Sequence, residues 1–220
     1  SPGNGTDPVV DGVYAVNGTY GLDRYSQYVG LAAVQDIWPG MMIWLLVVIG
    51  AVTALTQLGF LGRWLYHRVG NVPEEDLRAK QLPFTIGNII RIVFNFMLLP
   101  VVSLSMFQLV VAGQSPAYSV ALAVVTILIV LAFVIWVIRL IVTTRPRVYL
   151  FDDLSTVLMY GPLYNTYNDN TATFALVPTF LNIVWGIAIG ALPSSGIAQV
   201  VVLAICEVMY VLFLIAFRPY

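Results

Sequence analysis

The sequence predicts an all-α, polytopic membrane protein: a bundle of five transmembrane helices with one short interfacial helix. Hydrophobic residues make up 60% of the 220 residues, and the mean hydropathy is +0.88. Charged residues contribute only 10%, whereas a soluble globular domain contains about 25%. Five apolar stretches are also long enough to cross the ~30 Å hydrocarbon core of a bilayer as helices, which takes about 20 residues each.

Charged or turn-forming segments separate these five stretches. We expect the spans over residues 37–62, 83–111, 117–141, 171–192 and 197–217. The connections 113–116 and 193–196 are short and uncharged, so spans two and three, and spans four and five, are predicted to form helical hairpins. The connection 63–81 is charged and is predicted to be a hydrophilic loop, with a new helix starting near Pro73, which precedes three acidic residues.

Residues 1–36 are predicted to form a lumenal or extracellular tail and pre-membrane segment, followed by a transmembrane domain over residues 37–220. Asn4 and Asn17 each begin an Asn-Gly-Thr triplet, which makes both candidate N-glycosylation sites. Apolar residues at helical spacing within residues 24–35 indicate an interfacial lead-in, with Trp38 at the headgroup level.

The distribution of Lys and Arg predicts the same orientation. With the N-terminus lumenal, Arg24 alone lies on that side, and the C-terminus is cytosolic. This asymmetry is what the positive-inside rule requires of the cytosolic side. The predicted cytosolic cations are Arg63, Arg68, Arg78, Lys80, Arg139, Arg145, Arg147 and Arg218.

Between spans three and four, the sequence predicts a short helix along the membrane surface. Asp152 or Asp153 is suited to cap its N-terminus, and Gly161-Pro162 is expected to end it. A cation site at the two aspartates is the weaker interpretation, because calcium prefers 6–8 oxygen ligands. With a single Cys and a single His in the chain, no metal site is predicted.

Span two carries more polar residues than a simple anchor needs. Asn88, Arg91, Asn95 and Ser103 fall on one broad helical face, which is costly to expose to lipid. Glu207 of span five lies at a depth similar to that of Arg91, which permits a salt bridge. Alternatively, Arg91 snorkels to the interface while Glu207 is protonated or bonded to the backbone.

Further small and polar residues are candidates for helix contacts. Asn95 and Asn182 are expected to line a water path or to hydrogen-bond neighbouring helices, of which the second is commoner. Gly186 and Gly190 form a small-xxx-small pattern that favours packing within the chain over a dimer contact, and a homo-oligomer is a further possibility. Membrane lipids are expected partners, whereas the sequence contains no nucleic-acid-binding basic run and no enzymatic motif.

Several stretches resemble, in order, the fungal TRP-like membrane family, whose members are also called flavin carriers. The resemblance covers nearly all of residues 24–220 and implies a membrane protein of the secretory pathway, in the endoplasmic reticulum, vacuole or plasma membrane. It also implies a lumenal lipid-recognition-like domain before the spans and additional spans, so we expect this transmembrane domain to be incomplete. The matching stretches are residues 73–84, 103–108, 145–147, 160–167 and 216–220.

Three alternative functions are open, and the resemblance implies the first two of them. The leading hypothesis is a TRP-like transport protein, a subunit of a calcium-permeable cation channel. The second is a transporter of FAD in the endoplasmic reticulum, with FAD as substrate, although Arg91 is the sole cation well inside a predicted span, since Arg139 lies in the last turn of span three. The third is a non-conducting, lipid-binding membrane scaffold, in which Arg91, Asn95 and Glu207 satisfy one another in a dry core.

Overall fold

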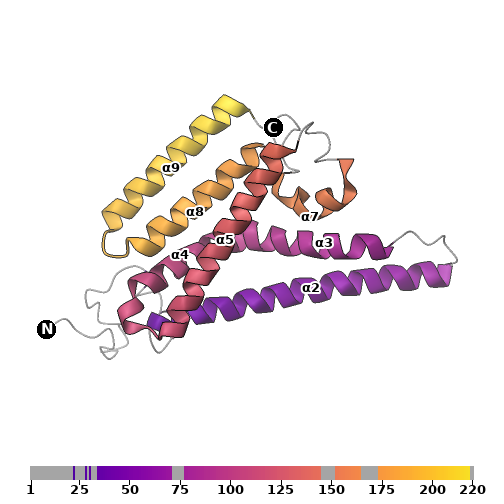
Figure 1. Ribbon diagram of the computed structural model, residues 1–220, viewed down its shortest axis with the longest axis horizontal. Coiled ribbons are helices and arrows are strands. Elements are labelled where there is room, and N and C mark those ends of the chain that lie inside the picture. Colours follow the sequence, from indigo (N-terminus) through magenta and orange to yellow (C-terminus); the bar gives the residue numbers. More distant parts are fainter. Residues whose placement is uncertain are drawn as a thin grey trace.

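The computed structural model describes residues 22, 28, 30, 34–70, 77–144, 152–164 and 173–218. Within these residues every regular element is a helix, as Figure 1 shows. Five helical stretches are long and apolar enough to cross a membrane, which confirms the predicted all-α bundle of five spans. They cover Val34–Val69, Lys80–Val110, Ala117–Thr143, Thr173–Ala191 and Gly196–Phe217.

The first helix is longer than predicted. A 3-10 turn at Val34–Asp36 leads into α2, Ile37–Gly70, which is ~51 Å long at ~1.5 Å per residue. The prediction that residues 63–70 belong to a loop was therefore wrong. Their charges make the segment hydrophilic, but Arg, Leu, Trp and Tyr are all compatible with a helix. The expected helix start near Pro73 lies outside the described residues.

The second span consists of two α-helices joined by a wider turn. Helix α3, Leu77–Ile92, continues through a π-helical turn, Val93–Met97, into α4, Leu98–Val110. Pro100 has no N–H to donate to the carbonyl of Phe96, so the backbone ladder is interrupted at this point. A wide turn beside a proline is a common way for a long helix to continue through such a break.

Two helical hairpins complete the bundle. Helix α5, Ala117–Thr143, follows α4 after a short turn, and Gln108 of α4 donates a 3.1 Å hydrogen bond to Ser119 of α5. Helices α8, Leu176–Ala191, and α9, Gly196–Phe217, lie side by side in Figure 1. Their turn is held by Gln199, which donates a 3.1 Å bond to the carbonyl of Ile189.

Helix α4 is the centre of the core. Its buried apolar residues pack with Leu45 of α2, Val130 of α5 and Ile183 of α8. The closest approach is to α8: a Cβ placed on Gly190 would stand 2.0 Å from the carbonyl oxygen of Ser103, and one on Gly186 would stand 2.8 Å from the Cβ of Val102. These two glycines let the backbones of α8 and α4 meet, so the contact lies within the chain.

The short helix α7, Leu154–Tyr164, packs against α3. Its N-terminus is capped by Asp153, which accepts hydrogen bonds from the hydroxyl of Thr156 and from its backbone N–H at 3.0 Å. These bonds lower the pKa of the Asp153 carboxyl. The prediction that Gly161-Pro162 ends the helix was wrong, because the helix continues to Tyr164. Pro162 lies close enough to the C-terminus that a single backbone hydrogen bond is lost.

Candidate functional site

A ladder of polar side chains joins α2 to α3, and we call it the polar seam. Asn88 donates a 3.3 Å hydrogen bond to the hydroxyl of Thr56, and Gln57 donates a 3.1 Å bond to the hydroxyl of Thr85. Gln81 donates to the side-chain carbonyl of Gln57. The Thr85 hydroxyl donates in turn to the backbone carbonyl of Gln81 at 2.7 Å. Both helices therefore contribute polar groups that satisfy one another.

Helical spacing explains why α3 can form its half of the seam. Gln81, Thr85 and Asn88 are separated by four and three residues, so they lie on one side of the helix. Thr85 is buried, with 7% of its surface exposed. Side-chain hydrogen bonds between transmembrane helices contribute about 0.6 kcal/mol each on average. The seam is thus a modest stabiliser, and its bonds can exchange without unfolding the helices.

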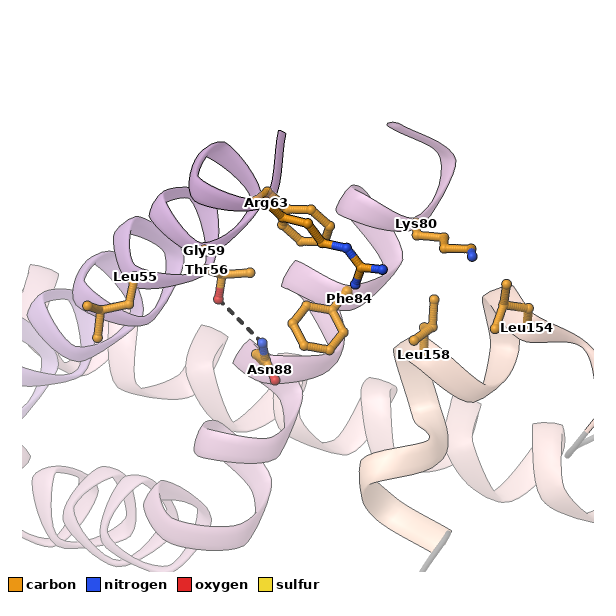
Figure 2. Close-up of a pocket in the computed structure, with 10 residues that line it drawn as sticks. Leu55, Thr56, Gly59, Arg63, Lys80, Phe84, Asn88, Leu154 and Leu158 are labelled. Carbon is orange, nitrogen blue, oxygen red and sulfur yellow. Dashed lines mark hydrogen bonds between the residues drawn. The ribbon is translucent and has the colours of Figure 1, made fainter. Parts of the chain in front are cut away.

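One cavity opens on the α7 side of the seam, and we call it the α7-side cavity. Its volume is about 580 Å³, within the ~300–1,000 Å³ range of small-molecule sites. Helices α2, α3 and α7 all contribute to it, as Figure 2 shows. It is lined by Leu55, Thr56, Gly59, Phe60, Arg63, Lys80, Phe84, Asn88, Leu154 and Leu158.

The polar and charged groups of this cavity lie at different levels. In Figure 2 the Arg63 side chain extends over Phe84 at the upper end, and the Asn88–Thr56 hydrogen bond lies below it. Phe84 is in edge-to-face contact with Phe60, with ring centroids 5.8 Å apart. The cavity therefore has a cationic end, aromatic and aliphatic walls, and a neutral polar pair further in.

A second cavity, of about 600 Å³, lies beside the same two helices. Gln57 and Gln81 of the polar seam line it, together with Trp64 and Phe60. Because Thr56 and Asn88 line the α7-side cavity while Gln57 and Gln81 line the second, the seam separates two spaces.

The structure does not join Arg91 to Glu207. Both side chains are exposed; α9 packs chiefly against α8, whereas α3 packs against α2 and α7. Asn95 is exposed in the π-helical turn, and Asn182 is half-buried on α8. Among the described residues no hydrogen bond or ion pair links any two of these four side chains. Asn4 and Asn17 lie outside the described residues.

Other predicted polar residues have structural roles. Asn88 belongs to the polar seam, whereas Ser103 is buried beneath Gly190. Trp38, whose predicted depth at the headgroups stays a prediction, is 4% exposed and donates a 2.9 Å hydrogen bond to Ser105. The ring therefore packs inside the bundle near the start of α2, and Ser105 satisfies its indole N–H.

Most of the polar seam was not predicted from the sequence. Gln57, Gln81 and Thr85 were left within a hydrophilic connection or unassigned inside a span. The i, i+4, i+7 spacing of Gln81, Thr85 and Asn88 was the available signal, since it predicts one polar helix face. Thr56 and Gln57 of α2 show no such spacing signal, because adjacent residues on a helix do not lie on one face.

Five apolar helices and an intramembrane polar ladder define an integral, multi-pass membrane protein. The chain belongs to the family described as "Transient receptor potential (TRP) ion channel", whose family model matches residues 6–220. This result confirms the TRP-like resemblance. One similar curated protein is the "Uncharacterized membrane protein C1322.03" of Schizosaccharomyces pombe (strain 972), at 23% identity over 202 residues.

The alignment with that relative covers 92% of this chain but 23% of the relative. The chain therefore spans about a quarter of the length of the curated protein that it matches. No solved structure matches the chain. The family model identifies the chain as an ion-channel-like membrane domain.

Proposed function

We propose that this chain forms part of the membrane domain of a calcium-permeable cation channel, with the polar seam beside the route of the ion. The seam carries the proposal because its amide and hydroxyl oxygens lie beside two cavities, between two helices that are long and apolar enough to cross a membrane. Neutral oxygens are the ligands that calcium accepts, supplemented by water and carboxylates. Membership of the TRP family supports transport of a cation.

The seam suits a gate because its bonds are weak and mutually replaceable. Thr85 accepts from Gln57 and donates to the Gln81 backbone, so moving one side chain frees the next. The π-helical turn lies five residues beyond Asn88 along the same span. Single π-helical turns inside α-helices occur frequently at functional sites. Rotation of α3 about this turn would open the seam to water.

A flux assay on the full-length protein in liposomes tests this proposal. Thr85→Val keeps the side-chain shape but removes the hydroxyl, and we expect it to change calcium flux several-fold. Thr126→Val is the matched control, because the Thr126 hydroxyl bonds only within α5, to the carbonyl of Leu122. If both variants give equal calcium flux at equal protein amounts, the polar seam does not lie beside the ion route. If the wild-type protein gives no calcium flux, the protein is not a calcium-permeable channel.

Transport of FAD is a second candidate, favoured by the composition of the α7-side cavity. Arg63 and Lys80 suit a pyrophosphate, and Phe60 and Phe84 suit a planar ring. The same liposomes test it: FAD uptake without calcium flux supports the carrier. A lipid-binding scaffold is the third candidate, and it predicts neither activity. All three are compatible with a secretory-pathway membrane, a lumenal N-terminus and a homo-oligomer.

A further inference from the structure

Two of the cations at one end of the bundle line a single cavity. Arg63 lies near the end of α2 and Lys80 near the start of α3, and both line the α7-side cavity. Each already makes an interaction within the protein, so an incoming anion would share or replace it. The Lys/Arg count predicts that this end is cytosolic, where anionic lipids produce a negative surface potential.

Apart from the Thr56–Asn88 pair, the rest of the cavity wall is apolar. Leu55 and Gly59 of α2 and Leu158 of α7 line it, together with the aromatic side chains of Phe60 and Phe84. Gly59 has no atom within 4 Å of where its Cβ would stand, so the wall is open at this point. The wall of the α7-side cavity therefore changes from cationic to apolar along its length. An anionic phospholipid has the complementary order, with a negatively charged headgroup followed by apolar acyl chains.

The distance between the cations and the neutral polar pair of the α7-side cavity fits the length of a phospholipid headgroup region. Arg63 is seven residues from Thr56 and Lys80 is eight from Asn88, so the cations lie ~10–12 Å above the neutral polar pair. The first methylene groups of an acyl chain and the glycerol esters would occupy this interval. Deeper in the wall, Asn88 donates a 3.3 Å hydrogen bond to the Thr56 hydroxyl, which itself donates to the carbonyl of Val52.

We propose that the α7-side cavity binds an anionic membrane phospholipid, with its phosphate at Arg63 and Lys80 and one acyl chain along Leu55, Gly59 and Leu158. Basic pockets between transmembrane helices are suited to such headgroups. Binding does not depend on conduction, so the proposal holds for a channel, a carrier or a scaffold. Because α2, α3 and α7 all line the site, the lipid stabilises their mutual packing.

Native mass spectrometry of the full-length protein in neutral detergent tests this site. The probes are dioleoyl phosphatidylinositol and dioleoyl phosphatidylcholine, which carry the same acyl chains and differ in headgroup charge. We expect the first bound phosphatidylinositol to appear at roughly tenfold lower concentration than the first phosphatidylcholine. The double variant Arg63→Gln/Lys80→Gln should abolish this preference.

Arg68→Gln is the matched charge control. Arg68 lies on the same helix over the ring of Trp64 and is not part of the cavity wall, so its loss should leave the lipid preference intact. Gly59→Leu fills the open wall while keeping both cations, and it should weaken binding of both lipids. Gly50→Leu is its control, because Gly50 is equally open but lies outside the cavity.

Three results would overturn the proposal. The first is unchanged phosphatidylinositol binding in the Arg63→Gln/Lys80→Gln protein. The second is equal affinity for glycerophosphoinositol, which lacks acyl chains and would identify a soluble phosphate ligand. The third is displacement of the lipid by FAD at equal concentration, which would assign the cavity to the flavin. Normal elution and thermal unfolding of each variant show that folding is unaffected.

Discussion

The carbonyl oxygen of Leu158 in α7 lies directly against Gly87 of α3: a Cβ on Gly87 would stand 1.9 Å from it. Pro162, four residues further along α7, has no N–H to donate to this carbonyl. The carbonyl is therefore available to contact the Cα–H of Gly87, a weak interaction that recurs at close helix–helix contacts. The contact determines how closely α7 approaches the second span.

Gly87→Ala should accordingly separate α7 from α3. The added methyl group meets backbone atoms that have little freedom to move, so we expect a loss of about 1–3 kcal/mol in the free energy of unfolding. Thermal unfolding in detergent measures it. Gly59→Ala is the control: its Cβ meets open space, and Ala gains up to about 1 kcal/mol of helix propensity over Gly. Equal stability of the two variants would contradict this assignment.

Gly190→Ala tests the corresponding contact between α8 and α4. The new Cβ would stand 2.0 Å from the carbonyl of Ser103, so α8 must move away from the core. We expect a lower midpoint of thermal unfolding than for Gly50→Ala, whose methyl group meets no neighbour. If Gly190→Ala unfolds at the wild-type temperature, this glycine does not limit the packing.

The Trp38–Ser105 hydrogen bond should behave as a coupled pair. Ser105 is fully buried, so Ser105→Ala leaves the indole N–H of Trp38 without its partner, at a cost of about 1–3 kcal/mol. Trp38→Phe leaves the Ser105 hydroxyl unpaired and creates a cavity. We expect the double variant to cost less than the sum of the two, whereas strict additivity in a double-mutant cycle would exclude the bond.

Arg91 and Glu207 should show the opposite behaviour. Their side chains are exposed on helices that pack against different neighbours. Effects of distant sites add within roughly 0.3–0.5 kcal/mol, so Arg91→Ala and Glu207→Gln should be additive in detergent stability. A larger coupling energy would mean that the two groups meet in the assembled protein, as the sequence alone suggested.

Tyr164 should make the packing of α7 sensitive to alkaline pH. Burial, assisted by the negative charge of Asp153, raises the pKa of its hydroxyl from 10.0 to about 12. A raised folded-state pKa gives stability that is complete below the unfolded value and is lost as pH rises from about 10 to about 12. The difference in unfolding temperature between wild type and Tyr164→Phe should shrink across this range. A constant difference would contradict the shift.

The five spans and the family were predictable because their signals are local. Insertion of a helix into a bilayer depends on the summed transfer free energy of its residues, so composition along the chain suffices. The Asp153 cap was predictable for the same reason, since a cap involves residues three positions apart. The errors at residues 63–70 and at Gly161-Pro162 arose because polar or helix-breaking residues were taken to end helices that continue.

By itself, the sequence determined the number of spans, the hairpins and the resemblance to the TRP family. Only the tertiary structure decided which helix faces meet: α7 on Gly87, α8 on α4, and the polar seam between α2 and α3. Arg91 and Glu207 illustrate the physical reason. Residue counting provides depth in the membrane, which is one coordinate, whereas contact also requires rotation about each helix axis and the choice of neighbour. Close packing of the helices determines both.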